Sequence, residues 1–203
     1  MLSDLFRVEL IHPFVVHFPI ALLINAGLVR ALQFIFRKRS WRNYLTPVYF
    51  WCLVSGIAGL FLAYLSGEQA ETQVERLICD PLVIEVHEDF AKLTILFSCV
   101  TLIFSVIVAL TGREPKAESN SSRLSSQIRR EKLLYAFRGI EFFSLACALG
   151  ALIYSSHLGA SLVYEQGAGF HRSPVKTCKD TVETIDSHPE HTEPITSEDN
   201  TPK

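Results

Sequence analysis

The sequence predicts an all-α fold, namely an integral membrane four-helix bundle of up-down-up-down connectivity that is followed by a disordered C-terminal tail. Of the 203 residues, 49% are hydrophobic, and they concentrate in four blocks without Asp, Glu, Lys or Arg. Each block is long enough to cross a bilayer, because a helix needs roughly 20 apolar residues to span a core about 30 Å thick. A soluble fold would have too little polar sequence to cover four such helices. The segment after the last block is acidic and rich in Ser, Thr and Pro, which is typical of disorder.

The apolar blocks place the expected helices in order. They run from Ile11 to Val29, from Pro47 to Gly67, from Leu93 to Gly112 and from Phe142 to Tyr164. With their flanking turns we expect spans at 12–36, 47–67, 90–112 and 139–164, in a transmembrane domain of residues 1–170 with an acidic tail of residues 171–203. The leader carries Asp4 and Glu9 against one basic residue, the wrong charge for a secretory signal, so we expect the first helix to stay in the mature protein. The sequence shows no repeat between the two pairs of blocks that is strong enough to indicate duplication.

The basic residues predict the orientation of the bundle. Lys and Arg near helix ends favour the cytoplasm, and 12 of the 19 basic residues lie in or beside the first and third connections. The second connection has seven Asp and Glu against Arg76 and Lys92. We therefore expect the first and third connections in the cytoplasm, and the second connection and both termini outside it. The predicted location is the cytoplasmic membrane.

Two of the five cysteines are candidates for a disulfide. Cys52, Cys99 and Cys147 lie inside apolar blocks and are expected to be buried as small hydrophobic side chains. Cys79 in the second connection and Cys178 in the tail both fall on the predicted outer side, where an oxidising compartment permits disulfides. A bond between them would tie the tail to the second connection, although the sequence does not show whether the two residues meet.

The seven histidines all fall on the predicted outer half, and two of them reach a similar depth in the membrane. His17 lies five residues beyond His12, hence roughly 8 Å deeper at the helical rise. His157 precedes Tyr164 by seven residues, hence it lies roughly 10 Å below the outer end of the last helix. Imidazole is a usual axial ligand of haem iron, and ionisable residues at membrane depth are candidates for functional sites. His17 and His157 are therefore candidate cofactor-binding residues for haem b in an electron-transfer module.

Two other interpretations of the histidines stay open. A copper or zinc site needs three or four donors close together, and the metal-ligand candidates nearest the surface are His12, His87 and Glu88. Alternatively, the histidines are hydrogen-bonded core residues of a structural or assembly subunit that has no chemistry of its own. No CxxCH motif is present, which excludes covalent attachment of c-type haem.

The sequence favours a binding or redox role over an enzyme. It contains no HExxH motif, no Gly-x-Ser-x-Gly motif and no Gly-rich phosphate loop. A net charge of −2 without a basic cluster excludes nucleic acid as an expected partner. The expected partners are the lipid bilayer and membrane or periplasmic redox proteins, and the sequence does not indicate an oligomeric state.

Several motifs resemble those of a bacterial membrane family that is catalogued as domain of unknown function 2231. The segment HPFVVHFPIALL, from His12 to Leu23, is similar to the family's opening motif. Three later segments are also similar to motifs of the family, namely Gly67-Glu68-Gln69-Ala70, His87-Glu88 with Ala91, and Gly159-Ala160-Ser161-Leu162-Val163-Tyr164 followed by Gly167 and Gly169. The chain departs from the family at Ala160, where a second Gly is usual, and at Gln166, where a His is usual. The resemblance covers residues 10–170 and implies a four-helix membrane domain without an established activity.

Overall fold

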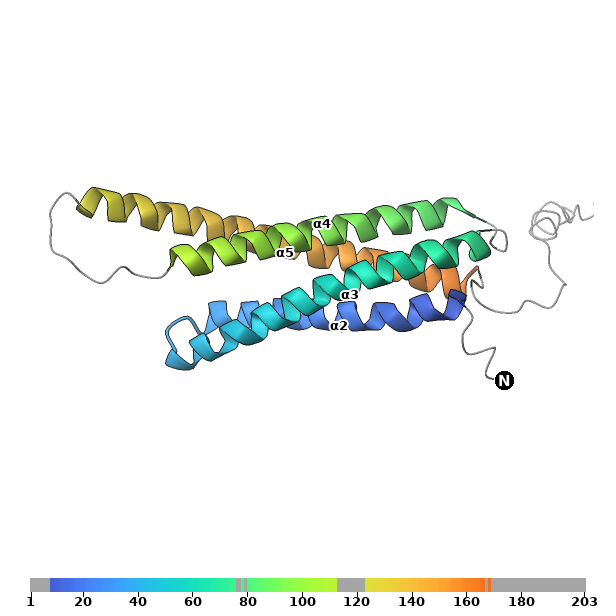
Figure 1. Cartoon of the computed structure of the whole chain (residues 1–203), viewed down its shortest axis with the longest axis horizontal. Helices are drawn as coiled ribbons and strands as arrows, with labels where there is room; N and C mark the ends of the chain where they lie inside the picture. Colours follow the sequence, from blue (N-terminus) through green and yellow to red (C-terminus); the bar gives the residue numbers. More distant parts are fainter. Residues whose placement is uncertain (1–7, 76–77, 79, 113–122, 167, 169–203) are drawn as a thin grey trace, which may run out of the picture. The chain divides into compact units, whose positions relative to one another are not determined.

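The computed structural model describes residues 8–75, 78, 80–112, 123–166 and 168, and the four long helices it contains confirm the predicted all-α fold. The elements are α2 (Val8–Ile35), the 3-10 helix η1 (Ser40–Tyr44), α3 (Leu45–Val74), α4 (Leu82–Thr111) and α5 (Arg123–Tyr164) (Figure 1). Each long helix has an apolar stretch long enough to cross a membrane. No strand occurs within the described ranges, and the predicted tail, 171–203, lies outside them.

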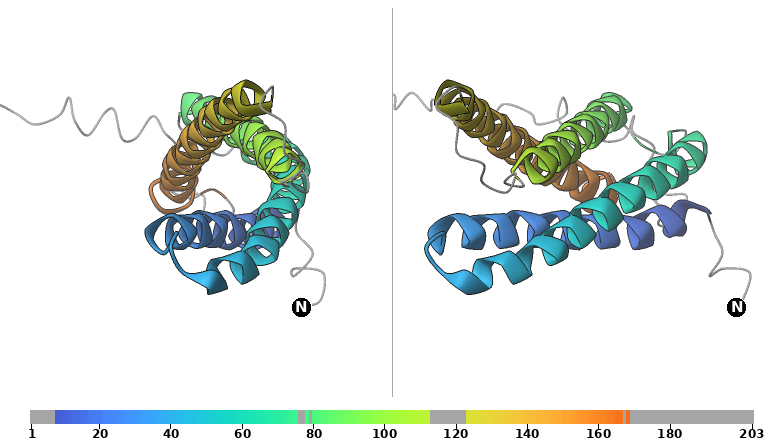
Figure 2. Two further views of the ribbon diagram at one scale, coloured as in Figure 1. Left: turned by 90° about the vertical axis from the view of Figure 1, so that its left-hand side faces the viewer. Right: turned by 60° about the vertical axis from the view of Figure 1, so that its left-hand side comes forward.

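The helices run alternately up and down and pair as two hairpins (Figures 1 and 2). The first hairpin consists of α2 and α3, and the second consists of α4 and α5. We call the end of the bundle where α2 and α4 begin the histidine end, because His12 and His87 lie there. The end that carries η1 is called the opposite end.

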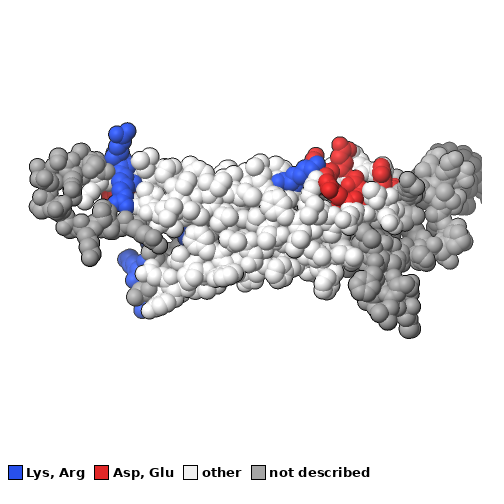
Figure 3. Space-filling view, in the orientation of Figure 1, with Lys and Arg blue, Asp and Glu red and all other residues white. Residues whose placement is uncertain are grey.

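The helices at the histidine end extend beyond the predicted apolar spans. Helix α3 continues past Gly67 to Val74, and α4 begins at Leu82, directly after its N-cap residue Pro81. The added residues of α3 include Glu, Gln and Ala, which are good helix formers, so nothing ends the helix at the edge of its apolar block. Acidic side chains of the second connection therefore stand on helical turns, and Figure 3 shows acidic residues gathered near this end.

Small residues let α2 and α3 pack closely within the first hairpin. A Cβ atom at Gly59 would lie 3.2 Å from Pro19 of α2, and one at Gly56 would lie 3.0 Å from Leu23. Small side chains in membrane helices allow the backbones to approach in this way. The fully buried Leu23 and Leu53 of the first hairpin then join Leu145 of the second in one hydrophobic cluster.

Buried residues recur at the same spacing in corresponding helices of the two hairpins, although the sequence does not indicate a duplication. In α2 the buried positions include Pro19, Leu23 and Ala26, and in α4 the equally spaced Thr94, Ser98 and Thr101 are buried. In α3 the buried positions include Leu53, Leu60 and Ala63, and in α5 the equally spaced Leu145, Leu152 and Ser155 are buried. The hairpins thus present corresponding faces to one another. The first face is mainly apolar at these positions, whereas the second carries hydroxyl groups.

Candidate functional site

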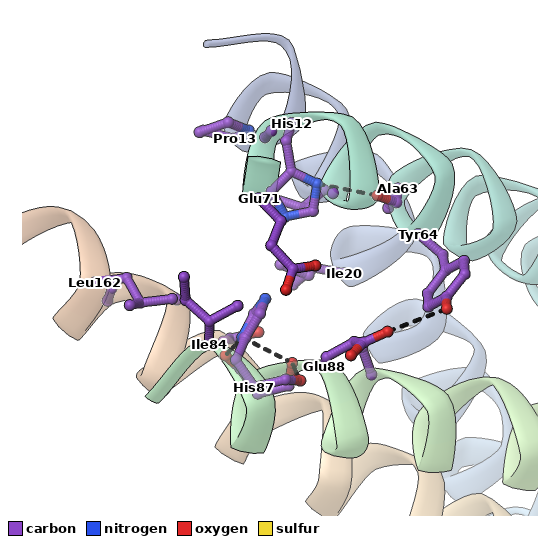
Figure 4. A pocket seen from close by; sticks show the side chains of 18 of the residues that line it. His12, Pro13, Ile20, Ala63, Tyr64, Glu71, Ile84, His87, Glu88 and Leu162 are labelled. Atoms are coloured by element: carbon purple, nitrogen blue, oxygen red, sulfur yellow. Dashed lines mark hydrogen bonds between the residues drawn. The ribbon is translucent and has the colours of Figure 1, made fainter. Parts of the chain in front are cut away.

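A cavity of about 520 Å³ lies between the helices at the histidine end. All four helices contribute to its wall, with His12 and Ile20 from α2, Tyr64 and Glu71 from α3, His87, Glu88 and Ile84 from α4, and Ser155 and Leu162 from α5 (Figure 4). Its size falls in the range of cavities that hold small molecules and cofactors, and its wall is mostly apolar with a few polar groups, as is usual for such sites. The polar groups decide what the cavity can bind.

The neighbouring helix α3 orients the ring of His12. Its Nδ1–H group donates a hydrogen bond to the carbonyl oxygen of Ala63 at 2.9 Å, and the Ser66 hydroxyl lies 3.2 Å from the same nitrogen. A carbonyl oxygen can only accept, so Nδ1 carries the proton of the neutral ring and Nε2 keeps a free lone pair. Gly67 makes room for the ring, because a Cβ atom there would lie 3.1 Å from His12 Cε1.

His87 is held in the same way by the second hairpin. Its Nδ1–H group donates to the carbonyl oxygen of Ser155 at 2.8 Å, and the Ser155 hydroxyl donates to the His87 carbonyl oxygen at 3.3 Å. A Cβ atom at Gly159 would lie 3.2 Å from His87 Cε1. In each hairpin the accepting carbonyl therefore stands one helical turn before a glycine that leaves space for the ring. Each Nε2 is an acceptor that has no partner among the residues described.

The two histidine rings face each other across the bundle. Their centroids are 6.3 Å apart and their planes are perpendicular. Figure 4 shows the His12 side chain from α2 and the His87 side chain from α4 pointing into the space between them. No hydrogen bond to either Nε2 is present among the described residues. The arrangement offers two neutral imidazole nitrogens to one ligand.

Two carboxylates share the cavity with the histidines. Glu88 accepts a hydrogen bond from the Tyr64 hydroxyl at 3.1 Å and forms an ion pair with Lys92 at 3.0 Å. Glu71 is half-buried, and Figure 4 shows it extending from α3 into the region between the two rings. Of these two acids, Glu88 is engaged by neighbouring side chains, whereas the Glu71 carboxylate has no hydrogen-bond partner within the described part of the chain.

The structure brings together three of the predicted site residues, His12, His87 and Glu88, around one cavity. His17 lies at the edge of that cavity with an exposed ring, whose Nδ1 is 2.5 Å from the Pro13 carbonyl oxygen of its own helix. His157 is exposed and is not among the lining residues. No ring contact joins His17 to His157, both of which are described.

Other predicted residues fall outside the site. Cys52, Cys99 and Cys147 are partly buried and free. Cys79 and Cys178, the predicted disulfide pair, lie outside the described residues. Among the residues that the structure does describe, no three His, Cys, Asp or Glu side chains lie close enough to hold a metal ion.

Sequence reasoning missed Tyr64, Glu71 and the roles of Gly67 and Gly159. The available signal was the similarity between the hairpins, because each places a histidine near the start of one helix and a glycine near the end of the next. That similarity concerns single residues separated by long apolar segments, and it becomes visible only when the helices are paired in space.

Residues 9–172 match the profile of a family described as a predicted membrane protein, DUF2231. The match covers all four helices and both site histidines. No curated protein and no solved structure matches the chain.

Proposed function

The chain belongs to the DUF2231 family of predicted membrane proteins, and we propose that it is a b-type haem-binding membrane protein for electron transfer, in which His12 and His87 would hold the haem. The observation that carries the proposal is the separation of 6.3 Å between the two ring centroids. Metal–nitrogen distances are about 2 Å, so two imidazoles whose ring centres are about 6 Å apart could hold one metal ion between them. The separation of the His12 and His87 rings is compatible with that arrangement.

The surroundings of the two rings fit such a ligand pair. A ligating histidine usually donates its other N–H to a carbonyl or carboxylate, which sets the tautomer and raises the basicity of the ligating nitrogen. The carbonyl oxygens of Ala63 and Ser155 accept these hydrogen bonds. Apolar side chains such as Ile20, Ile84 and Leu162 line the cavity and would exclude water from a bound macrocycle. Haem would supply a one-electron iron couple, whereas the chain supplies the two ligands and their orientation.

The proposal uses a different ligand pair from the one that the sequence predicts. Matched depth selected His17 and His157, but both rings are exposed and the structure records no contact between them. His12 and His87 differ from them in that each ring is anchored by a second helix. His17 and His157 are therefore the natural control positions for an experiment on His12 and His87.

The proposed orientation places the histidine end on the outer side of a bacterial inner membrane. The opposite end carries the basic residues Arg37, Lys38 and Arg39, which favour the cytoplasm, and Figure 3 shows basic side chains at that end. Both termini would then lie outside the cytoplasm. The haem would exchange electrons with membrane or periplasmic redox proteins near the outer face.

A second candidate function is binding of copper or zinc without haem. The supporting observation is that Glu71 and Glu88 line the same cavity as the two histidines, since imidazole and carboxylate together suit these metals. This candidate needs Glu71 or Glu88 to move closer to both rings, because the described residues contain no group of three donors at metal-binding distance. The haem proposal needs no third protein donor, but it requires the Glu71 side chain to leave the region between the two rings.

The decisive measurement is a reduced-minus-oxidised absorption spectrum of the purified protein, with copper, zinc and iron assayed on the same sample. A Soret band with sharp α and β bands on reduction supports the haem proposal. Stoichiometric copper or zinc without a Soret band supports the second candidate. Protein from cells well supplied with haem and metals that carries neither would contradict both, and the histidines would then be structural groups of an assembly subunit.

A further inference from the structure

A polar side chain lies exposed near the middle of the first membrane-spanning helix. Polar groups inside the bundle are engaged there, as where Arg30 of α2 forms an ion pair with Glu141 of α5, which is 0% exposed. Asn25 of α2 is exposed instead. It stands 14 residues after Ile11 and 10 before Ile35, hence roughly 21 Å and 15 Å from the two ends of the apolar helix. In a single copy, the amide therefore faces the hydrocarbon core of the bilayer.

The amide of Asn25 is only partly satisfied by its own helix. One N–H of its Nδ2 donates to the carbonyl oxygen of Ala21 at 2.8 Å. The second N–H and the Oδ1 atom have no partner among the described residues. Hydrocarbon provides neither donors nor acceptors, so polar groups left unsatisfied there are costly. Asn25 thus retains one donor and one acceptor that a second molecule can satisfy.

The other exposed positions in the membrane-spanning helices do not share this problem. In the apolar blocks of α3 and α4, every exposed residue is apolar or glycine. The exposed His17 of α2 and the exposed Tyr154 and His157 of α5 lie nearer the outer ends of their helices than Asn25 does. Ring side chains of this kind extend their polar tips toward the headgroups. The side chain of Asn25 is too short to do so from its depth.

The face of α2 around Asn25 is suited to pack against another helix. Phe18, Ala21 and Leu28 lie on this face, seven and four residues before Asn25 and three after it, and all three are exposed. The small Ala21 allows a second helix to approach closely, and Asn side chains hydrogen-bond across such membrane interfaces. One Asn among apolar residues is also what fixes register and the number of strands in coiled coils. The face therefore combines apolar packing surface with one central polar contact.

We infer that this face of α2, formed by Phe18, Ala21, Asn25 and Leu28, is the interface of a homodimer in which the two Asn25 amides hydrogen-bond to each other. Copies inserted in the same orientation carry Asn25 at the same depth, so a two-fold axis along the membrane normal brings the amides together. A carboxamide is complementary to itself, because each donates an N–H to the Oδ1 of the other. An interface between identical patches closes as a dimer. The inference does not depend on haem, since Asn25 does not line the cavity.

The test measures association of the full-length protein in liposomes. Two pools, labelled with donor and acceptor fluorophores on a peptide tag after Lys203, are reconstituted together at decreasing protein-to-lipid ratios. Energy transfer against this ratio gives the dissociation constant of the dimer, and excess unlabelled protein must suppress the transfer. The key variant is Asn25→Leu, which removes the amide at an exposed position. Tyr154→Phe is its matched control, because it removes a hydroxyl from an exposed position of α5.

A second pair of variants locates the interface. Ala21→Trp adds a large ring to the proposed face, whereas Ala58→Trp adds the same ring to α3. Both alanines are exposed, so neither ring has to enter the packed bundle. Ala21→Trp should abolish energy transfer, because the ring keeps the two helices apart. Ala58→Trp should behave as the wild type.

We expect specific energy transfer in the wild type and in Tyr154→Phe. Asn25→Leu should raise the dissociation constant about tenfold, which corresponds to about 1.4 kcal/mol and agrees with the strength of hydrogen bonds between membrane helices. A wild type without specific energy transfer would overturn the inference and leave this face to a different membrane protein. Wild-type dissociation constants in Asn25→Leu or in Ala21→Trp would overturn it as well. The absorption spectrum of each variant tests the haem proposal separately.

Discussion

His12 and His87 stand in different hairpins, yet their rings lie 6.3 Å apart with perpendicular planes. Each ring donates a hydrogen bond to a carbonyl oxygen of the helix that follows it in the chain, at 2.9 Å for His12 and 2.8 Å for His87. The cavity therefore receives one equivalently held histidine from each half of the bundle. The position of each ring depends on the packing within its own hairpin, so the site should be sensitive to changes at Gly67 and Gly159, which make room for the rings.

The first prediction concerns the ligand pair. His12→Ala or His87→Ala should abolish the Soret band, because each removes one of the two proposed axial ligands. His17→Ala and His157→Ala are the matched controls and should keep the spectrum, since their rings are exposed. The measurement is the reduced-minus-oxidised spectrum per mole of purified protein. Loss of haem in the His17 and His157 variants alone would instead support the ligand pair that the sequence predicts.

The second prediction concerns the glycines that make room for the rings. Gly159→Ala would place a Cβ atom 3.2 Å from His87 Cε1 and should shift the ring away from the Ser155 carbonyl. Loss of such an orienting hydrogen bond typically weakens metal binding by about 10–100-fold. Gly150→Ala on the same helix is the control, because a Cβ atom there meets nothing within 4 Å. Titration of haem into the apoprotein of both variants checks the prediction, which fails if their affinities are equal.

The third prediction concerns the buried ion pair. Glu141→Gln should destabilise the bundle by about 3 kcal/mol, because it leaves the Arg30 charge buried without its counter-charge. Glu131→Gln, at an exposed position of the same helix, should change stability by less than about 0.5 kcal/mol. Thermal unfolding in detergent measures both. Replacing both partners with Arg30→Met and Glu141→Leu should recover much of the loss, and equal stability of Glu141→Gln and the wild type would contradict the assigned role.

The fourth prediction concerns Cys79 and Cys178, which lie outside the described residues. If they pair, reduction of the protein and alkylation of its thiols should add two more labels than alkylation without reduction. The difference should vanish in Cys178→Ser. Cys147→Ser is the control, because Cys147 is free within α5 and its loss should leave the reducible pair intact. Equal labelling of the wild type with and without reduction would exclude the disulfide.

The fifth prediction concerns orientation. A reporter enzyme that is active only outside the cytoplasm should be active when fused after Lys203, and inactive when fused in the first connection after Arg39. The physical reason is the concentration of basic residues in the first connection, which favours retention in the cytoplasm. The opposite pattern of activity would place the histidine cavity on the cytoplasmic side.

The helix count and the all-α class could be predicted from the sequence because both depend on local composition. Apolar blocks such as Pro47 to Gly67 must form helices in a bilayer, since every backbone N–H and C=O group there needs an internal partner. Helix ends were harder to predict. Helix α3 continues to Val74 and α4 begins at Leu82, because charged residues outside the membrane can continue a helix that apolar residues start.

The site was only partly predictable. His12, His87 and Glu88 were identified as metal-ligand candidates from their positions near helix ends, and the structure brings these three residues to one cavity. The depth of a histidine in the membrane does not show which other histidine its ring faces, because depth ignores the direction in which a side chain leaves its helix. His17 and His157 reach similar depths, but their rings are exposed.

The sequence by itself determined that the chain is a four-helix membrane protein, because hydrophobicity along a single segment decides whether that segment can span a bilayer. Only the tertiary structure decided that His12 meets His87 and that Arg30 meets Glu141, since both contacts join different hairpins. In the sequence, Arg30 and Glu141 lie just beyond the edges of two apolar blocks and resemble ordinary flanking charges. Their burial follows from the rotation of each helix about its own axis, which is set by close packing at residues such as Gly56 and Gly59 and not by composition.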